Sequence, residues 1–386
     1  MPACPRQKAQ VRKLKEAKGV RAAIRSAMEL RQAWKRMSVT SKGATVKRQY
    51  RIFSFCALLL CGAGLSSTAP FYRMVKSITL GGEGRWDYVA FDAPGHRLFI
   101  ARETRVMVVD PDNGKVLGEI PGLNGAHGVA LAYETGHGFA TSGHDGSVTM
   151  FDLNTLKVLG QIPAAPDADA ILYDPASKRI FTFNGDSRSA TVIDPVSGKR
   201  IGTIDLGAEP EFAVTAGDGK LYVNLEDKGA VAEIDAAAMR VTRQWSIAPC
   251  ESPTGLAIDR AHHRLFSGCG NKVMVISDAT AGKLVTTVPI GEGVDACAFD
   301  PDTQLAFASN GDGTLTVVHE DTPAQFRVVA NVGTRKGART MALDEKTHRV
   351  YTVTADLGPP PAPTADHPHP WPSVVPGTFM MLVLGP

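Results

Sequence analysis

The sequence predicts an all-β protein, a seven-bladed β-propeller with four strands in each blade and an N-terminal strand that closes the last blade. Three observations lead to this fold class. A segment of the form DYVAFD recurs seven times, at spacings of 40–44 residues. Each copy is followed by further short apolar runs that are separated by Gly, Pro, Asn and Asp turns. The final copy lacks a strand that the segment before the first copy can supply. Four strands repeating about every 42 residues are the pattern of propeller blades.

The third copy illustrates the elements of one unit. Its first strand starts at Asp169, its second covers Arg179–Phe181 and its third covers Ala190–Asp194, before a Pro-Val-Ser-Gly turn. Runs this short, bounded by turn residues, are strands rather than helices. Each small sheet buries its faces only against its neighbours, so the ring has to close.

The two ends of the chain predict how closure occurs. The seventh unit offers Thr340–Asp344, Arg349–Thr354 and Thr378–Leu384, which is one strand short. Tyr72–Leu80 precedes the first unit and has no unit of its own. We expect it to become the outer strand of the last blade, because this pairing removes an exposed sheet edge.

Residues 72–386 resemble the YncE-like, YVTN-type family of seven-bladed propellers. Tyr222-Val223-Asn224 is the nearest form of the YVTN string. The resemblance implies an exported propeller, often one without an assigned reaction. The matching segments are Gly84–Tyr88, Pro166–Asp174, Pro210–Val214, Ser309–Thr314 and Ala338–Asp344.

The N-terminal 69 residues differ from the repeats. Residues 1–36 are basic, and we interpret them as a start-site artefact, with a nucleic-acid or membrane-surface tail as the alternative. Residues 37–69 predict a signal peptide, because a basic stretch precedes the apolar run Ile52–Leu65 and small residues follow it. The mature domain is then 70–386, periplasmic or secreted. Leu58-Leu59-Leu60 before Cys61 argues against a lipoprotein, since a small residue normally precedes a lipidated cysteine.

Charge and hydropathy narrow the range of partners. Beyond residue 51 the chain has 27 basic and 37 acidic residues, so we expect no nucleic-acid partner. The longest apolar run has 14 residues, short of the roughly 18 that a membrane-spanning helix needs. We expect a monomer whose partner is a small molecule or a periplasmic protein.

The first residue of each innermost strand should line one mouth of the central channel. Crowded carboxylates there would repel one another unless a cation or a bound ligand offsets them. The alternatives are a solvated polar rim, a ligand site, or a Ca²⁺ site that uses Asp87, Glu211 and Asp295. Trp86, Asn184 and Asn310 are added as candidate ligand contacts. The seven ring residues are Asp87, His127, Asp169, Glu211, Thr254, Asp295 and Arg339.

Cysteines and one proline-rich segment complete the candidates. Cys250 and Cys269 fall near one face of the fifth unit, which predicts a disulfide in an oxidising compartment. Cys297 lies within an apolar strand and reads as a buried thiol. Leu357 to Thr378 holds eight prolines, so we expect an extended loop insertion that acts as a partial lid or partner contact.

Three functions remain open. The first is an exported binding module without catalysis. The second is a lactonase-type hydrolase, with His127, Arg339 and Glu211 activating water and stabilising an oxyanion. The third is a periplasmic scaffold for a redox partner. The sequence has no P-loop, zincin, nucleophile-elbow or haem-attachment motif, so it gives no cofactor beyond Ca²⁺.

Overall fold

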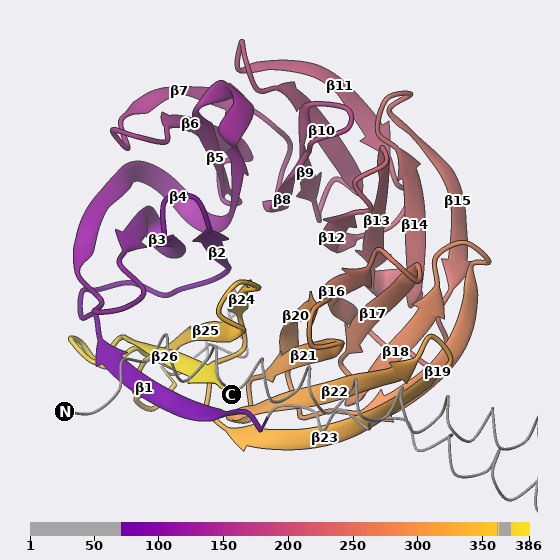
Figure 1. Ribbon diagram of the computed structural model, residues 1–386. Helices are drawn as coiled ribbons and strands as arrows, with labels where there is room; N and C mark the ends of the chain where they lie inside the picture. Colours follow the sequence, from indigo (N-terminus) through magenta and orange to yellow (C-terminus); the bar gives the residue numbers. More distant parts are fainter. Residues whose placement is uncertain (1–70, 361, 363–371) are drawn as a thin grey trace, which may run out of the picture. The chain divides into compact units, whose positions relative to one another are not determined.

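Short antiparallel strands arranged around an open centre make up the described part of the chain (Figure 1). The computed structural model describes residues 71–360, 362 and 372–386, which fall in the unit Ala69–Pro386. The basic segment 1–36, the predicted signal peptide 37–69 and Cys61 lie outside the described residues. The all-β prediction is confirmed for the described residues. Apart from strands and loops, they form two short 3-10 helices, η1 (Tyr133–Thr135) and η2 (Glu226–Lys228).

The strands pair into six hydrogen-bonded sheets, so the prediction of seven four-stranded blades is wrong. Five sheets have four strands and one has six, β2-β3-β4-β5-β6-β7. The cause is β4, whose residues Val116–Pro121 pair with β3 and whose residues Val129–Ala132 pair with β5. β4 continues through this stretch, although Gly122 and Gly125 have positive φ values, so the first two sequence repeats share one hydrogen-bonded sheet. Its strands are β2 (Val89–Asp92), β3 (Arg97–Val109), β4 (Val116–Ala132), β5 (His137–Ser142), β6 (Ser147–Asp152) and β7 (Val158–Pro163).

The next four sheets each correspond to one sequence repeat. The third repeat forms β8 (Ala168–Asp174), β9 (Arg179–Asn184), β10 (Ser189–Asp194) and β11 (Lys199–Asp205). The fourth forms β12 (Pro210–Thr215), β13 (Lys220–Leu225), β14 (Ala230–Asp235) and β15 (Arg240–Ser246). The fifth forms β16 (Pro253–Asp259), β17 (Arg264–Cys269), β18 (Val273–Asp278) and β19 (Lys283–Pro289). The sixth forms β20 (Val294–Asp300), β21 (Leu305–Asn310), β22 (Thr314–Thr322) and β23 (Gln325–Gly333).

The last sheet joins the two ends of the described chain. Its order is β1 (Arg73–Thr79), β26 (Met380–Gly385), β25 (Arg349–Thr354) and β24 (Met341–Asp344). β1 runs antiparallel to β26, with Arg73 opposite Gly385 and Thr79 opposite Met380. The predicted closure by the N-terminal strand is therefore confirmed, and it pairs an edge that would otherwise be open.

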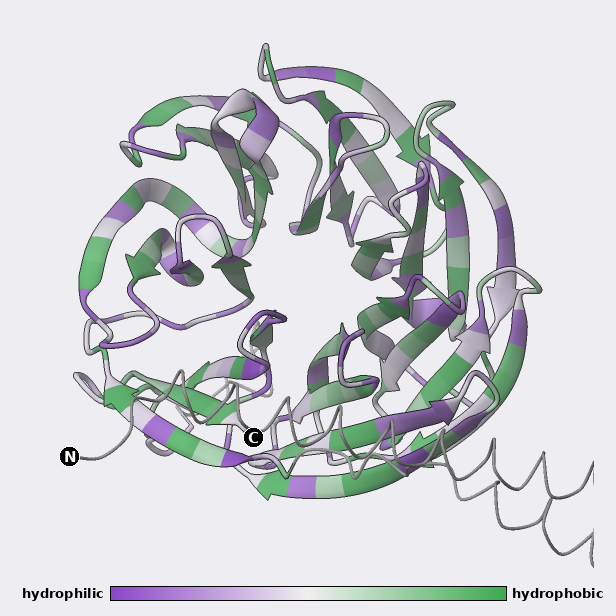
Figure 2. Cartoon of the chain, in the orientation of Figure 1, coloured by the Kyte–Doolittle hydropathy of each residue, from purple (hydrophilic) through white to green (hydrophobic). Residues whose placement is uncertain are grey.

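Apolar side chains fill the spaces between neighbouring sheets. Phe181 and Phe183 of β9 belong to the same buried cluster as Leu221 and Val223 of β13. The outermost strands have one solvent-exposed face, and β15 alternates strictly between exposed and partly buried residues. Figure 2 shows the same alternation of polar and apolar positions along the outer strands. This pattern is expected for a sheet that is covered on one face only.

A buried aspartate ends several innermost strands and shapes the turn that follows. Asp174 accepts a hydrogen bond from the backbone N–H of Ser177, and Asp344 accepts one from the hydroxyl of Thr347. Each carboxylate thus satisfies groups that the tight turn leaves without a strand partner. The buried aspartates at this position are Asp92, Asp174, Asp259, Asp300 and Asp344.

The proline-rich insertion is only partly described. Leu357 and Val374 form an isolated antiparallel bridge at its base. Residues 361 and 363–371 lie outside the described part, so its predicted role as a lid or partner contact stays a prediction. In the described residues, no helix has the length and apolar character needed to cross a membrane.

Candidate functional site

The candidate site is the group of side chains at the start of the innermost strands. His127 lies in β4 and Asp169 in β8, while Asp87 lies two residues before β2. Glu211, Asp295 and Arg339 hold the matching positions in or beside β12, β20 and β24. The electrostatic influence of Asp87 reaches Asp169, Glu211, Asp295 and Arg339, so these side chains share one region.

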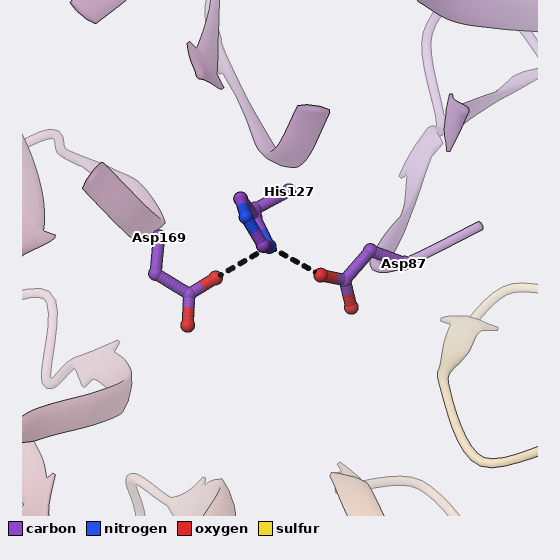
Figure 3. A group of neighbouring side chains, drawn as sticks. All are labelled: Asp87, His127 and Asp169. Atoms are coloured by element: carbon purple, nitrogen blue, oxygen red, sulfur yellow. Dashed lines mark hydrogen bonds and ion pairs between the residues drawn. The ribbon is translucent and has the colours of Figure 1, made fainter. Parts of the chain in front are cut away.

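Three of these side chains form a compact cluster, shown in Figure 3. His127 Nδ1 lies 2.5 Å from Asp87 Oδ2 and 3.3 Å from Asp169 Oδ1. One N–H can donate to only one of these oxygens, and Asp169 Oδ1 is a buried atom without a hydrogen-bond partner among the described residues. The three side chains are 16–26% exposed, so they remain accessible from the mouth.

The surroundings of the cluster raise the pKa values of His127 and Asp169. Burial alone would lower the pKa of His127, but the hydrogen bond to Asp87 and the nearby carboxylates outweigh it and raise the pKa to about 9. Burial raises the pKa of Asp169 to about 8, and the Asp87 charge adds to this although His127 opposes it. At neutral pH the imidazole is therefore cationic and the Asp169 carboxyl is largely protonated.

Tyr88 brings a hydroxyl into the same region. It donates a hydrogen bond to Glu211 Oε2 over 3.2 Å and packs edge-on against Phe212. Burial, with the charges of Asp169 and Asp295, raises the pKa of Glu211 well above its ordinary value. The sequence analysis missed Tyr88, because it chose Trp86 as the aromatic residue beside Asp87. The phenol on the other side of Asp87 was the available signal.

An ion pair adjoins the histidine cluster, because the hydroxyl of Thr340, the residue after Arg339, donates to the carbonyl of Asp87. Arg339 Nε is 3.2 Å from Asp295 Oδ2. Burial raises the pKa of Asp295 to about 6, although Arg339 opposes the shift. Counting His127 and Arg339 against four carboxyl groups, the mouth contains more acid than base, and it limits its charge by keeping protons on some of the acids.

Four other predicted contacts have structural partners. The Thr254 hydroxyl donates to the carbonyl of Val294. Trp86 packs against Phe379, with ring centroids 5.6 Å apart. Asn184 and Asn310 are fully buried and donate to side chains or backbone of their own sheets. The structure therefore does not bring these four side chains into the carboxylate cluster.

A pocket of about 500 Å³ opens beside the histidine cluster. Gly143 lines it and also abuts His127, since a Cβ on Gly143 would lie 2.6 Å from His127 Nε2. A side chain at this position would displace the imidazole, so the glycine makes room for it. The charged or titratable residues that line the pocket are His144, Asp145, Asp167 and Asp186.

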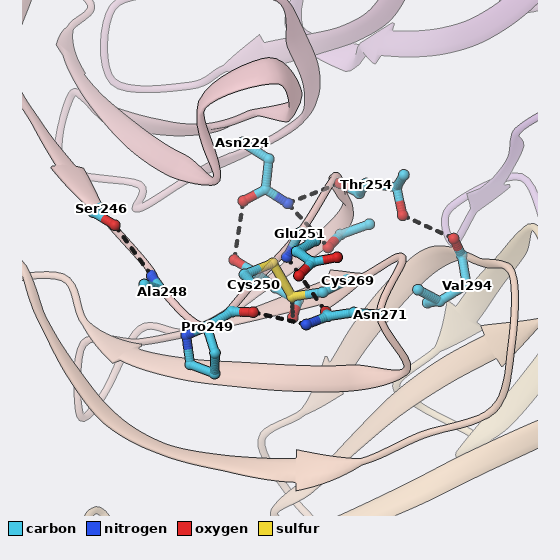
Figure 4. The surroundings of a disulfide bond; sticks show 12 residues. Asn224, Ser246, Ala248, Pro249, Cys250, Glu251, Thr254, Cys269, Asn271 and Val294 are labelled. Atoms are coloured by element: carbon cyan, nitrogen blue, oxygen red, sulfur yellow. Dashed lines mark hydrogen bonds between the residues drawn. A yellow bond between two sulfur atoms is a disulfide. The ribbon is translucent and has the colours of Figure 1, made fainter.

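The disulfide lies near the start of β16 (Figure 4). Cys250 and Cys269 are bonded, as the sequence predicts, and Cys297 is a buried free cysteine. Asn271 reinforces the same loop, because its side chain donates to the carbonyl of Pro249 and accepts from the N–H of Glu251. The Cys250–Cys269 disulfide fixes the segment that leads into Thr254 and the mouth.

Comparisons with known proteins support the fold and no more than the fold. The chain is similar to the solved structure of U3-55K, with a TM-score of 0.65 and 9% identity over 81% of this chain and 98% of the other. It is also similar to the WD40 repeats of RRP9, with a TM-score of 0.66 and 9% identity over 82% and 99% of the two chains. Neither a protein-family model nor a curated protein matches the sequence. The chain thus has a β-propeller fold, and its likeness to the YncE-like family stays a prediction.

Proposed function

We propose that this protein is an exported binding module that holds a ligand with a cationic group, such as an amine, at the mouth of the propeller. One observation carries the proposal: four acidic side chains meet at the mouth, and burial together with mutual repulsion raises the pKa values of Asp169, Glu211 and Asp295. A lysine side chain of a partner protein offers the same chemistry as a small amine.

The raised pKa values explain why a cation would bind. A carboxyl group that keeps its proton at neutral pH does so because its charged form lacks compensation. A cation placed between Asp169 and Glu211 supplies that compensation, so both groups can ionise. Binding should therefore release protons.

The donor set favours an organic cation over Ca²⁺. Calcium sites use six to eight oxygen ligands. Here the imidazole of His127 lies between the carboxylates of Asp87 and Asp169, where an ion would need oxygen. Ca²⁺ nevertheless belongs in the binding panel as a direct test of this reasoning.

Export draws support from two features. A basic stretch, an apolar run and small residues precede the propeller, in the order of a signal peptide. The Cys250–Cys269 bond is a feature of proteins that fold in oxidising compartments. Fractionation of cells that express the tagged full chain tests export, and a product found only in the cytoplasm contradicts it.

Calorimetry on the purified chain tests the cation site. The panel contains alkylamines, lysine esters, Ca²⁺, small anions and lactones, each run in two buffers of different ionisation enthalpy. We expect amine binding with proton release, and at least about tenfold weaker binding in Asp169→Asn/Glu211→Gln. Arg339→Gln should strengthen amine binding, because it removes a like charge from the mouth.

A matched control keeps the result specific. Glu134 is an exposed acid in η1 that pairs with Lys178, so Glu134→Gln should bind as the wild type does. Binding of anions in place of amines, with loss in Arg339→Gln, would overturn the cation proposal. Equal binding by the double variant would show that the ligand lies elsewhere.

Acid catalysis is the second candidate, favoured by the Asp87–His127 pair. Asp87 holds Nδ1, which leaves the Nε2 proton of a cationic imidazole available to a leaving group. We expect lactone hydrolysis that is lost in His127→Ala and Arg339→Ala if the site is catalytic. A wild-type chain with no turnover across the lactone panel would exclude this candidate.

A further inference from the structure

A second histidine–carboxylate cluster lies at the other ends of the strands from the mouth. β16 begins beside Thr254 and ends at Asp259. His262 follows in the turn between β16 and β17, and Glu320 lies near the end of β22 in the neighbouring sheet. The sequence analysis assigned no function to these three residues.

The three side chains direct their polar atoms at one point. His262 Nδ1 lies 2.6 Å from Asp259 Oδ2 and 3.0 Å from Glu320 Oε1. One ligand atom from each residue fits within a group whose members are all within 4.8 Å of one another. Ligand atoms about 2.0–2.1 Å from a tetrahedral Zn²⁺ lie farther apart than hydrogen-bonded atoms, so the three side chains would open slightly around a bound ion.

Glu320 is the observation that points to a ligand. Its residue exposure is 3%, and neither carboxylate oxygen has hydrogen-bond geometry with any described residue. Oε1 has its approach to His262, and Oε2 has no hydrogen-bond partner in the described part of the chain. A buried carboxylate without hydrogen bonds is costly, unless a cation compensates it.

The nearest arginine does not provide that compensation by direct contact. Arg264 donates through Nε to the carbonyl of Pro323 and through Nη1 to Asp278 and the carbonyl of His262. No hydrogen bond or ion pair between Arg264 and Glu320 is formed among the described residues. The two buried carboxylates therefore share one histidine between them.

The repeats show that this cluster departs from the pattern elsewhere in the chain. The residue three after the turn aspartate is Ser177, Thr303 or Thr347 in other repeats, and here it is His262. His319 holds the strand-end position of Asp278, and Glu320 continues the strand past it, whereas Asp194 and Asp278 end their strands and cap exposed turns. Both departures occur where the sheets of β16 and β22 meet.

We propose that Asp259, His262 and Glu320 bind a divalent transition-metal ion of the zinc type, which links the two neighbouring sheets. One imidazole nitrogen with two carboxylates is a donor set that suits Zn²⁺ better than Ca²⁺ or Mg²⁺. The His262 side chain is 39% exposed, so solvent can reach the ion and complete its coordination. The ion takes the place of the proton on Nδ1 and balances both carboxylates.

The test is metal binding by the purified full chain. Equilibrium dialysis against Zn²⁺ measures stoichiometry and affinity, and Co²⁺ serves as a spectroscopic probe of the ligands. Glu320→Gln keeps the shape and removes the charge, while His262→Asn removes the nitrogen ligand. Each should weaken Zn²⁺ binding at least about tenfold. The cobalt complex should lack the charge-transfer band that a cysteine ligand would give.

The controls separate this site from other metal-binding groups. His263→Asn alters the adjacent histidine, whose φ of 55° asparagine tolerates, and should leave binding unchanged. The measurements are repeated in a His127→Asn/His367→Ala/His369→Ala background, which removes the mouth histidine and the two histidines of the proline-rich segment.

Each outcome of the Zn²⁺ binding measurement either supports the site or overturns it. Loss of one bound Zn²⁺ per chain in Glu320→Gln or His262→Asn, with retention in the background variant, supports the site. A wild type that binds no Zn²⁺, or equal binding by both single variants, overturns it. If Glu320→Gln does not fold, His262→Asn decides alone, because its exposed side chain is not needed for the core. The amine-binding proposal stands or falls separately.

Discussion

The mouth of the propeller and the cluster at the far ends of β16 and β22 are built from the same motif, one histidine Nδ1 facing two carboxylates. At the mouth, three repeats each supply one side chain, and each is 16–26% exposed. At the far cluster, Asp259 and Glu320 have side chains only 1–2% exposed, and the histidine alone reaches solvent. The same set of side chains, one histidine and two carboxylates, is therefore solvent-accessible at the mouth, whereas at the far cluster both carboxylates are almost fully buried.

The difference in surroundings changes what each cluster can hold. The mouth also contains Glu211, Asp295, Tyr88 and Arg339, so protons and charges can redistribute when a ligand of variable shape enters. The far cluster has fewer charged neighbours, and Arg264 acts on Glu320 only through its charge, because its hydrogen bonds go elsewhere. A small ion fits the closed cluster, while a larger cation fits the open one.

Removing the disulfide should give the largest effect, lowering stability and amine affinity at the mouth without changing the far cluster. Cys250 and Cys269 close a loop of 19 residues, so Cys250→Ser/Cys269→Ser should lower the free energy of unfolding by about 3 kcal/mol. Amine affinity should fall too, because the bond holds the segment before Thr254. Urea unfolding and calorimetry measure both. Zn²⁺ stoichiometry should not change, and a loss of Zn²⁺ would show that the two ends of β16 are coupled.

The pH dependence of stability should be the next largest effect. Asp169 has a pKa of about 8 in the folded chain, above its ordinary 3.8, so the folded state keeps a proton that the unfolded chain releases. Its contribution is complete below pH 4 and is lost as the pH rises through 8; His127, raised to about 9, acts in the same direction.

Urea unfolding at pH 6 and pH 9 checks this expectation. The wild type should lose at least about 1 kcal/mol between the two, and Asp169→Asn should lose clearly less. Glu134→Gln is the control and should follow the wild type. Parallel losses in all three chains would mean that the mouth carboxyl does not titrate as proposed.

A single added methyl group should give the smallest effect and separate the clusters most cleanly. In Gly143→Ala the new Cβ would meet His127 Nε2 at 2.6 Å, so the imidazole must shift and its hydrogen bond to Asp87 is disturbed. We expect the pKa of His127, followed by NMR, to fall toward its ordinary value and amine binding to weaken severalfold. Gly160→Ala has open space around its Cβ and should change neither quantity. Zn²⁺ binding should be unaffected by both.

The two regions also show which structural features the sequence repeat can predict. The repeat predicted the strands, the closure by β1 and the convergence of ring residues, because each follows from a period and a local alternation. It did not predict six sheets. Pro121, Gly122 and Gly125 lie between the first two repeats, yet β4 pairs on both sides of them and merges the two repeats into one sheet.

The two clusters differ in how much of each was visible in the sequence. His127 and Asp169 could be assigned to one mouth from their positions in the repeat, although Tyr88 was missed. The repeat pattern gave His262 no function, because its partner Glu320 is 58 residues away in another sheet. Only the packing of β16 against the sheet of β22 brings the two together.

The sequence by itself determined the strands, the turns with their buried aspartates, the closing strand and the position of the disulfide. These depend on neighbours in the chain or on a regular period, and a one-dimensional pattern carries both. The tertiary structure decided the number of sheets, the contact of His127 with two carboxylates and the burial of Glu320. Those depend on side-chain directions and on how neighbouring sheets pack, which act over distances that no local pattern records.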